Sequence, residues 1–306
     1  MNKLIKNKIF ACFGALICAA LWGTAFPLIK LGYLKLGIAS SDIASKLLFA
    51  GERFTVAGII VFIFGLLVYK KEALIKGRDL LPVALLGVVQ TCLQYLFAYV
   101  GVGFTTAANT SIITGTVSII SVILAGIFFK NDRITPLKIF GCILGLIGIA
   151  CVNFTDFSLA SVTFAGDVIV LLSAFSGAFG NIITKKISPG KNPTAVTAAQ
   201  LFIGGALLLI LGAAFGGRTN FNTEALLILL WLSLVSSVSF LLWTALLKHH
   251  PVSRITVFTM LIPIFGTVWS FILLGEDIFK IENLISLALV SGGIVTVNLR
   301  GKENEN

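Results

Sequence analysis

The chain consists of apolar runs of about 20 residues separated by short polar breaks, and this pattern leaves few possible folds. A helix rises about 1.5 Å per residue, so such a run spans a hydrocarbon core roughly 30 Å thick. Only α-helices and closed β-barrels satisfy their backbone hydrogen bonds in lipid, and barrel strands alternate in polarity and end after about 10 residues. The sequence therefore predicts an all-α integral membrane protein.

The composition agrees with this fold class. The chain is 57% hydrophobic and 12% charged, and its mean hydropathy of +1.02 is far too high for a soluble domain. The net charge of +10 would suit nucleic acid, but the basic residues lie between the apolar runs and mostly in alternate loops. We therefore expect the lipid bilayer as a partner and no nucleic acid.

Ten runs predict ten transmembrane helices. The first follows a basic N-terminus, as in a signal peptide, but it is too long for one and is followed by others, so we expect an uncleaved helix. The predicted spans are Ile9–Ile29, Leu47–Tyr69, Leu80–Gly101, Thr106–Phe129, Thr135–Phe154, Gly166–Lys185, Pro193–Phe215, Ala225–Lys248, Val252–Leu274 and Ile281–Leu299.

The basic residues predict the orientation of these helices. With a cytoplasmic N-terminus, most of the 23 Lys and Arg residues fall on the cytoplasmic side. This predicts a multi-pass protein of the inner (plasma) membrane with both termini, including the tail 300–306, in the cytoplasm. The smaller set on the other side is Lys30, Lys35, Lys46, Arg53, Arg218 and Lys280.

The second half of the chain repeats the first. The segment Ala20–Phe26 parallels Ala174–Gly180, and Thr106–Asn153 parallels Pro251–Asn298. Because each half holds five helices, the second half must enter the membrane from the opposite side. The sequence thus predicts a 5+5 inverted repeat, a frequent architecture of secondary transporters in which a central site lies between the halves. Two such halves can adopt two near-equivalent arrangements, one open to each side.

Several short motifs occur in order along the chain: Ala20–Pro27 in the first span, Glu52–Phe54 in the second, Gly166–Asp167 at the sixth, and Pro263 with Gly275–Glu276 around the ninth. With these motifs the chain resembles the EamA-type transporters of the drug/metabolite transporter superfamily over its whole length. It departs from that pattern in the fourth span, where Ser118 replaces an expected proline, and after it, where Lys130–Asp132 replaces Gly-Glu.

The resemblance implies a ten-helix 5+5 fold with one repeat in residues 1–154 and a second in 166–299. It also implies a central cavity lined by the first, third, fourth, sixth, eighth and ninth helices. Small metabolites would cross through this cavity, and the direction would be export.

The ionisable residues bear on energy coupling. None of the 13 acidic residues lies at the middle of a predicted span, and Glu52 is the deepest of them. His249 and His250 sit together at a cytoplasmic helix end. Because no buried carboxylate or histidine relay is expected, the sequence favours facilitated diffusion or exchange over proton coupling.

Neutral polar and aromatic side chains inside the spans are the candidate substrate contacts. Their alternative role is packing: such residues also join helices by hydrogen bonds, and Trp and Arg also anchor helices at the membrane surface. Two prolines inside spans are expected to break their helices, either as packing kinks or beside a cavity. The substrate-binding candidates are Trp22, Thr24, Gln90, Gln94, Tyr95, Tyr99, Asn109, Thr114, Asn181, Ser239, Trp243 and Arg254, and the helix-breaking prolines are Pro27 and Pro263.

We expect no metal and no cofactor. The five cysteines fall in apolar runs without a CxxC pair, so they predict packing residues. No HExxH, GxSxG or P-loop motif supports an enzyme. The function expected is alternating-access transport of an amino acid, amphipathic metabolite or drug-like solute. A flippase for lipid-linked substrates and a non-transporting structural or signalling protein remain alternatives, and both monomer and homodimer remain open.

Overall fold

The computed structural model describes residues 5–105, 107–152, 164–275 and 281–299, and every regular element in these ranges is helical. The elements are α2 (Lys8–Leu36), α3 (Ile43–Tyr69), η1 (Lys70–Ala73), α4 (Gly77–Leu86), η2 (Gly87–Leu93), α5 (Gln94–Val102), α6 (Ala107–Phe128), α7 (Pro136–Val152), α8 (Phe164–Ile187), α9 (Pro193–Ala214), α10 (Thr223–His249), α11 (Val252–Thr256), η5 (Val257–Leu261), α12 (Ile262–Leu274) and α13 (Ile281–Leu299).

Within the described ranges, nine helices are long and apolar enough to cross a bilayer, and a tenth, Pro136–Cys151, is apolar but shorter. The elements α4, η2 and α5 join into one span, and so do α11, η5 and α12. The prediction of an all-helical membrane protein is therefore confirmed. The end of the predicted fifth span and the tail 300–306 lie outside the described residues.

The first two helices are longer than the apolar runs predict. Helix α2 continues to Leu36, where Gly37 ends it in the left-handed conformation (φ 67°), and α3 begins at Ile43. Lys30, Lys35 and Lys46 therefore extend from helices rather than from a loop. Lysines at helix ends can hold their charged heads in water while their stems lie along apolar surface.

The two prolines inside spans behave differently. Helix α2 does not break at Pro27, which is buried within a continuous helix. One proline removes a single backbone donor, and α2 is held on both sides of it by packing against α10 and α12. Pro263 does mark a change of geometry, because it is at the start of α12, directly after the 3₁₀ segment η5.

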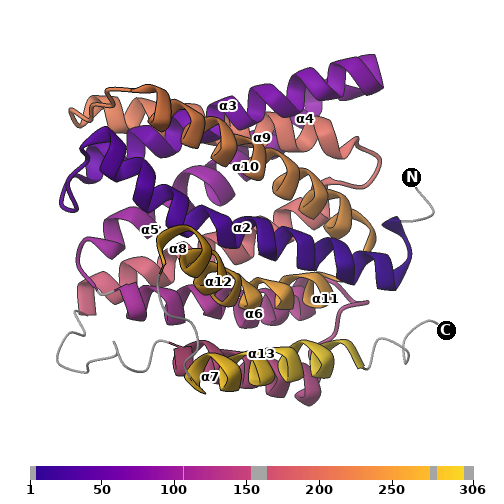
Figure 1. Cartoon of the computed structure of the whole chain (residues 1–306). Coiled ribbons are helices and arrows are strands. Elements are labelled where there is room, and N and C mark those ends of the chain that lie inside the picture. Colours follow the sequence, from indigo (N-terminus) through magenta and orange to yellow (C-terminus); the bar gives the residue numbers. More distant parts are fainter. Residues whose placement is uncertain (1–4, 106, 153–163, 276–280, 300–306) are drawn as a thin grey trace.

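Two helix pairs form opposite flanks of the bundle: α3 with α9, and α7 with α13 (Figure 1). Glycines bring the paired backbones into contact. A Cβ atom added at Gly51 of α3 would lie 2.3 Å from the backbone nitrogen of Leu209 in α9, and one at Gly293 of α13 would lie 2.4 Å from the carbonyl oxygen of Gly141 in α7. Close approach through small residues is the usual means of packing helices in lipid.

Between these flanks, α2 packs on α10 and α12, while α8 packs on α5 and α6. The start of α2 and the end of α13 lie at the same end of the bundle (Figure 1). We call this the termini end and the other the opposite end.

Candidate substrate-binding site

An amide network centres on Gln90, which lies in the π-helical segment η2 of the third span. The Gln90 Oε1 atom accepts hydrogen bonds from Gln200 Nε2 (2.8 Å) and Thr184 Oγ1 (3.2 Å), and its Nε2 donates to Asn181 Oδ1 (3.2 Å). Buried amides need such partners, and here the protein supplies them. Single π turns inside α-helices are frequent at functional sites. The network ties η2 to α8 and α9.

Asn181 extends this network toward α6 and α10. Its Nδ2 donates to Ser121 Oγ (3.3 Å), and its Oδ1 also accepts from Trp243 Nε1 (3.0 Å). The side chain is buried, with 3% exposure. Asn181 is thus a fixed polar centre that holds the indole of Trp243 in one orientation.

Trp243 belongs to a cluster of aromatic rings that we call the aromatic group: Trp22, Phe54, Tyr95, Phe240 and Trp243. Their centroids lie 5.0 Å apart for Trp22 and Trp243, 5.5 Å for Trp22 and Phe240, 6.1 Å for Phe54 and Phe240, and 4.4 Å for Phe54 and Tyr95. The first three are stabilising edge-to-face pairs, and the rings of Phe54 and Tyr95 are tilted at 53° to each other. Four helices, α2, α3, α5 and α10, contribute to the group.

Arg53 of α3 adjoins the aromatic group and is buried, with 3% exposure. Its guanidinium carbon lies 4.1 Å from the ring centroid of Phe54 and 5.5 Å from that of Tyr95. The sequence predicts Arg53 near the outer surface, but ten residues of α3 precede it, which places it about 15 Å from the start of the helix. The sequence feature that could have indicated this depth is the position of an arginine within an apolar run.

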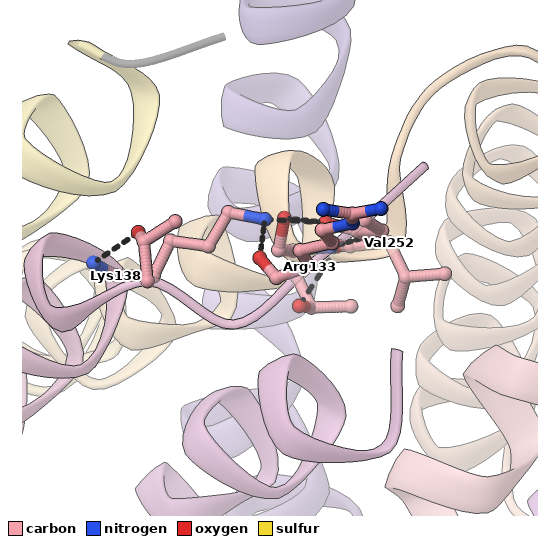
Figure 2. Close-up of polar contacts among 7 residues, drawn as sticks. Arg133, Lys138 and Val252 are labelled. Carbon is pink, nitrogen blue, oxygen red and sulfur yellow. Dashed lines mark hydrogen bonds and ion pairs between the residues drawn. The ribbon is translucent and has the colours of Figure 1, made fainter. Parts of the chain in front are cut away.

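A second polar cluster lies at the termini end, around Asp132 in the loop between α6 and α7. Asp132 is 3% exposed and accepts hydrogen bonds from Lys138 Nζ (2.6 Å), from the backbone N–H of Ser253 (2.9 Å) and from Ser253 Oγ. Lys138 Nζ also donates to the carbonyl oxygen of Arg133 (2.9 Å), and Figure 2 shows the lysine reaching that loop beside Val252 of α11. The carboxylate therefore binds the start of α11, where a negative charge is favourable.

A model of the EamA-like transporter family matches residues 9–154 and again residues 164–299. The chain belongs to the EamA-like transporter family. It is therefore a multi-pass membrane transporter with a small-molecule substrate, located in the plasma membrane.

Relatives of this EamA-like transporter occur in bacteria and archaea. An uncharacterized transporter of Archaeoglobus fulgidus is 26% identical over 90% of this chain and 91% of its own. The transporter YvbV of Bacillus subtilis is 27% identical over 99% and 95%. A probable amino-acid metabolite efflux pump of Salmonella typhimurium is 25% identical over 93% and 94%. A solved crystal structure superposes with a TM-score of 0.81 at 17% identity, covering 97% of this chain and all of the other, and shows the same fold.

The fold of this EamA-like protein brings several sequence-predicted residues together. Trp22, Tyr95 and Trp243 belong to the aromatic group, and Tyr99 lies 6.3 Å from Tyr95 between ring centroids. Gln90 and Asn181 form the network beside them.

Gln94 lies one position beyond the π segment and packs against Gly177 of α8. Its backbone carbonyl accepts a hydrogen bond from Ser173 Oγ (2.7 Å). Among the described residues, Gln94 therefore contacts α8 and makes no hydrogen bond to the network around Gln90.

Other predicted residues lie elsewhere. Thr24 is buried and donates to the carbonyl of Leu21 in its own helix (2.7 Å), Thr114 is exposed, and Arg254 is on α11 at the termini end. Ser239 is buried in α10, where its carbonyl accepts a hydrogen bond from Cys18 Sγ. The side chain of Asn109 lies outside the described part of the structure.

His250 attaches the N-terminal segment to the termini end. Its Nε2 lies 2.6 Å from the carbonyl oxygen of Ile5, and because a carbonyl only accepts, Nε2 carries the proton. Burial lowers the pKa of this imidazole below its ordinary value; the carbonyl of Ile5 raises the pKa, and Arg254, Lys185 and Lys8 lower it further.

This lowered pKa predicts a loss of stability in acid. The unfolded chain takes up the proton first, so the contribution of His250 is complete above about pH 6.5 and is lost as the pH falls through the lower folded value. We expect the Tm of the purified protein in detergent to fall between about pH 7.5 and about pH 5.5. His250→Gln, which keeps a donor, should reduce this fall. Equal falls in the variant and the wild type would contradict the assignment.

Proposed function

We propose that this transporter exports amino acids or related small amphipathic metabolites by alternating access, and that the aromatic group and the amide network form its substrate site. The observation that carries the proposal is the joining of Trp22 and Trp243, from the first and eighth spans, to a polar centre at Asn181. Aromatic faces suit an apolar side chain and fixed amides suit polar ends, a combination typical of small-molecule sites. Salmonella typhimurium and Escherichia coli relatives named as probable amino-acid metabolite efflux pumps support the substrate class and direction.

We infer that the two halves, residues 1–154 and 166–299, are an inverted 5+5 repeat. Helix packing supports this. With the spans numbered in order, the first packs on the eighth and ninth, and the sixth packs on the third and fourth. The second packs on the seventh and the fifth on the tenth. Moving every number by five returns the same set of pairs. Inverted halves of this kind supply two alternative arrangements around one site.

We place the termini end in the cytoplasm. The basic residues near the N-terminus, in 70–78 and in 185–191 support this orientation, because cytoplasmic loops carry excess Lys and Arg. Transport in this proposal is facilitative or by exchange. Two acidic residues already have partners within the chain: one carboxylate oxygen of Glu52 accepts a hydrogen bond from Thr219 Oγ1 (2.6 Å), and Asp132 is paired with Lys138.

The test is counterflow. The protein is reconstituted into liposomes loaded with one unlabelled L-amino acid at a time, and exchange with the labelled compound is followed with and without a pH gradient. Saturable exchange that is indifferent to the gradient would support the proposal, and gradient-driven uptake would overturn the facilitative part. Failure of every amino acid, together with exchange of a lipid-linked substrate, would favour a flippase.

Two matched tryptophan variants locate the site. Trp243→Phe removes the Nε1–H that bonds Asn181, whereas Trp231→Phe makes the same change in the same helix at a side chain that is 52% exposed. A neutral hydrogen bond contributes about 1 kcal/mol net, so we expect about a fivefold slower exchange for Trp243→Phe. Trp231→Phe should exchange at the wild-type rate. Equal rates in all three proteins would place the substrate elsewhere.

A further inference from the structure

We propose that Arg53 binds the carboxylate of the transported substrate. The inference rests on the proposed function, because it assigns a charge to the substrate of the same site. It begins from the depth of the residue: Arg53 is 3% exposed and about 15 Å along α3 from the opposite end. Ionisable side chains at such positions in membrane proteins are rare and usually mark substrate or ion pathways.

Arg53 has no counter-charge in the described part of the structure, since no carboxylate there lies within ion-pair distance of it. The neighbouring Glu52 is adjacent in sequence, but its carboxylate is not within ion-pair distance of Arg53. Glu52 is directed instead to Thr219, in the segment between α9 and α10. The guanidinium is therefore a buried positive charge that no carboxylate among the described residues neutralises.

Its immediate contacts are two aromatic rings. Phe54 and Tyr95 present their faces to the guanidinium at 4.1 Å and 5.5 Å from their ring centroids. Such contacts stabilise the cation but supply no negative charge to it. The Nε atom of Arg53 is buried and has no hydrogen-bond partner.

A second buried donor, in the aromatic group, also lacks a hydrogen-bond acceptor. The Nε1 atom of Trp22 is buried and without a partner, in contrast to Nε1 of Trp243, which is bonded to Asn181. Both Trp22 and Phe54 border Phe240, so the two unpartnered donors belong to one cluster. Buried donors without acceptors are costly and uncommon in folded proteins.

The ligand that satisfies these groups has a negative charge and several acceptor lone pairs, but little bulk. A carboxylate meets all three conditions, and guanidinium binds it with two parallel hydrogen bonds. The surrounding rings suit an apolar side chain on the same molecule. We therefore assign the substrate class as small amphipathic molecules with a free carboxylate, which includes amino acids.

The experiment compares each amino acid that undergoes counterflow, beginning with L-leucine, with its carboxamide, L-leucinamide for leucine. The amide keeps the ammonium group and the side chain and loses only the negative charge. In the wild type we expect the acid to exchange at least about ten times faster than the amide, as for the loss of one charge-assisted hydrogen bond. Arg53→Gln should bring this ratio close to one, and Arg53→Lys should retain part of it.

Arg218→Gln is the matched control, because Arg218 is exposed in the segment that follows α9. Its ratio should equal that of the wild type. The ratio does not depend on how much variant protein folds, and Arg53→Lys provides a second reading if Arg53→Gln is unstable. A wild-type ratio near one, or an unchanged ratio in Arg53→Gln, would overturn the role of Arg53 while leaving the proposed function intact. Absence of exchange for all amino acids would instead overturn the proposed function, and this inference with it.

Discussion

Replacing Asp132 with alanine is expected to destabilise the protein by about 3 kcal/mol. The substitution leaves the Lys138 ammonium without its counter-charge and the backbone N–H of Ser253 without its acceptor, at a site that is 3% exposed. Removing one member of a buried ion pair costs about 3–5 kcal/mol, and the lower figure applies because the Lys138 side chain is 17% exposed. The measurement is the free energy of unfolding in detergent, with the Tm as a second reading.

Asp79→Ala is the control for this prediction. Asp79 pairs with Lys191 at 3.3 Å, but both side chains are about one-fifth exposed, at 22% and 21%. Solvent reaches both members of this pair, and pairs near the surface contribute about 0–1 kcal/mol, so Asp79→Ala should change stability little. Equal losses in the two variants would show that the Asp132 cluster contributes no more than a surface pair.

The second large effect is expected at Gly293 of α13. A Cβ atom there would lie 2.4 Å from the carbonyl oxygen of Gly141 and 3.1 Å from the backbone nitrogen of Gly145. Both are backbone atoms, which cannot rotate out of the way as a flexible side chain can. Overpacking costs about 1–3 kcal/mol and more where the backbone must shift. We therefore expect Gly293→Ala to lower the free energy of unfolding by about 3 kcal/mol and to lower the Tm.

At the neighbouring Gly292, we expect an alanine substitution not to lower the free energy of unfolding. A Cβ atom at Gly292 would meet only Cδ2 of Leu144, at an ordinary contact distance of 3.5 Å. Alanine is favoured over glycine within a helix by about 1 kcal/mol, so Gly292→Ala should be neutral or stabilising. If Gly293→Ala were as stable as Gly292→Ala, the close approach of α7 and α13 would be disproved.

The membrane helices were predictable because hydrophobic length is a local property of the sequence. The spans appear where the apolar runs predict them, with longer ends at Leu36 and Ile43. These ends could not be read from hydropathy, because polar residues continue a helix beyond the apolar run when their side chains reach water. Gly37 was the local signal for the end of α2.

The candidate site was predictable only in part. Trp22 and Trp243 could be proposed as cavity residues, but nothing in the sequence gives their 5.0 Å separation. Helical spacing predicts Gln90 and Gln94 on one face. The π segment ends between them, and Gln90 is held in the amide network while Gln94 packs on Gly177. A π segment depends on tertiary packing, so a one-dimensional pattern does not reveal it.

Charge counting is least informative for residues whose partners are distant in sequence. Asp132 reads as a loop residue, yet its bond to Ser253 spans 121 positions and buries it. Arg53 reads as one of several charges on the outer side, yet it is buried against Phe54 and Tyr95. In both cases burial is decided by helices that the local sequence does not contain.

The glycine contacts of the two flanking pairs have a mechanical consequence. At Gly51 and Gly293 one backbone contacts another with no side chain between them. Because no deformable side chains separate the two helices there, they cannot slide past each other easily. The pair α3 with α9 and the pair α7 with α13 are therefore rigid walls (Figure 1). In the proposed alternating-access cycle, we therefore expect one side of the molecule to open by a rocking of the helices that lie between these two pairs.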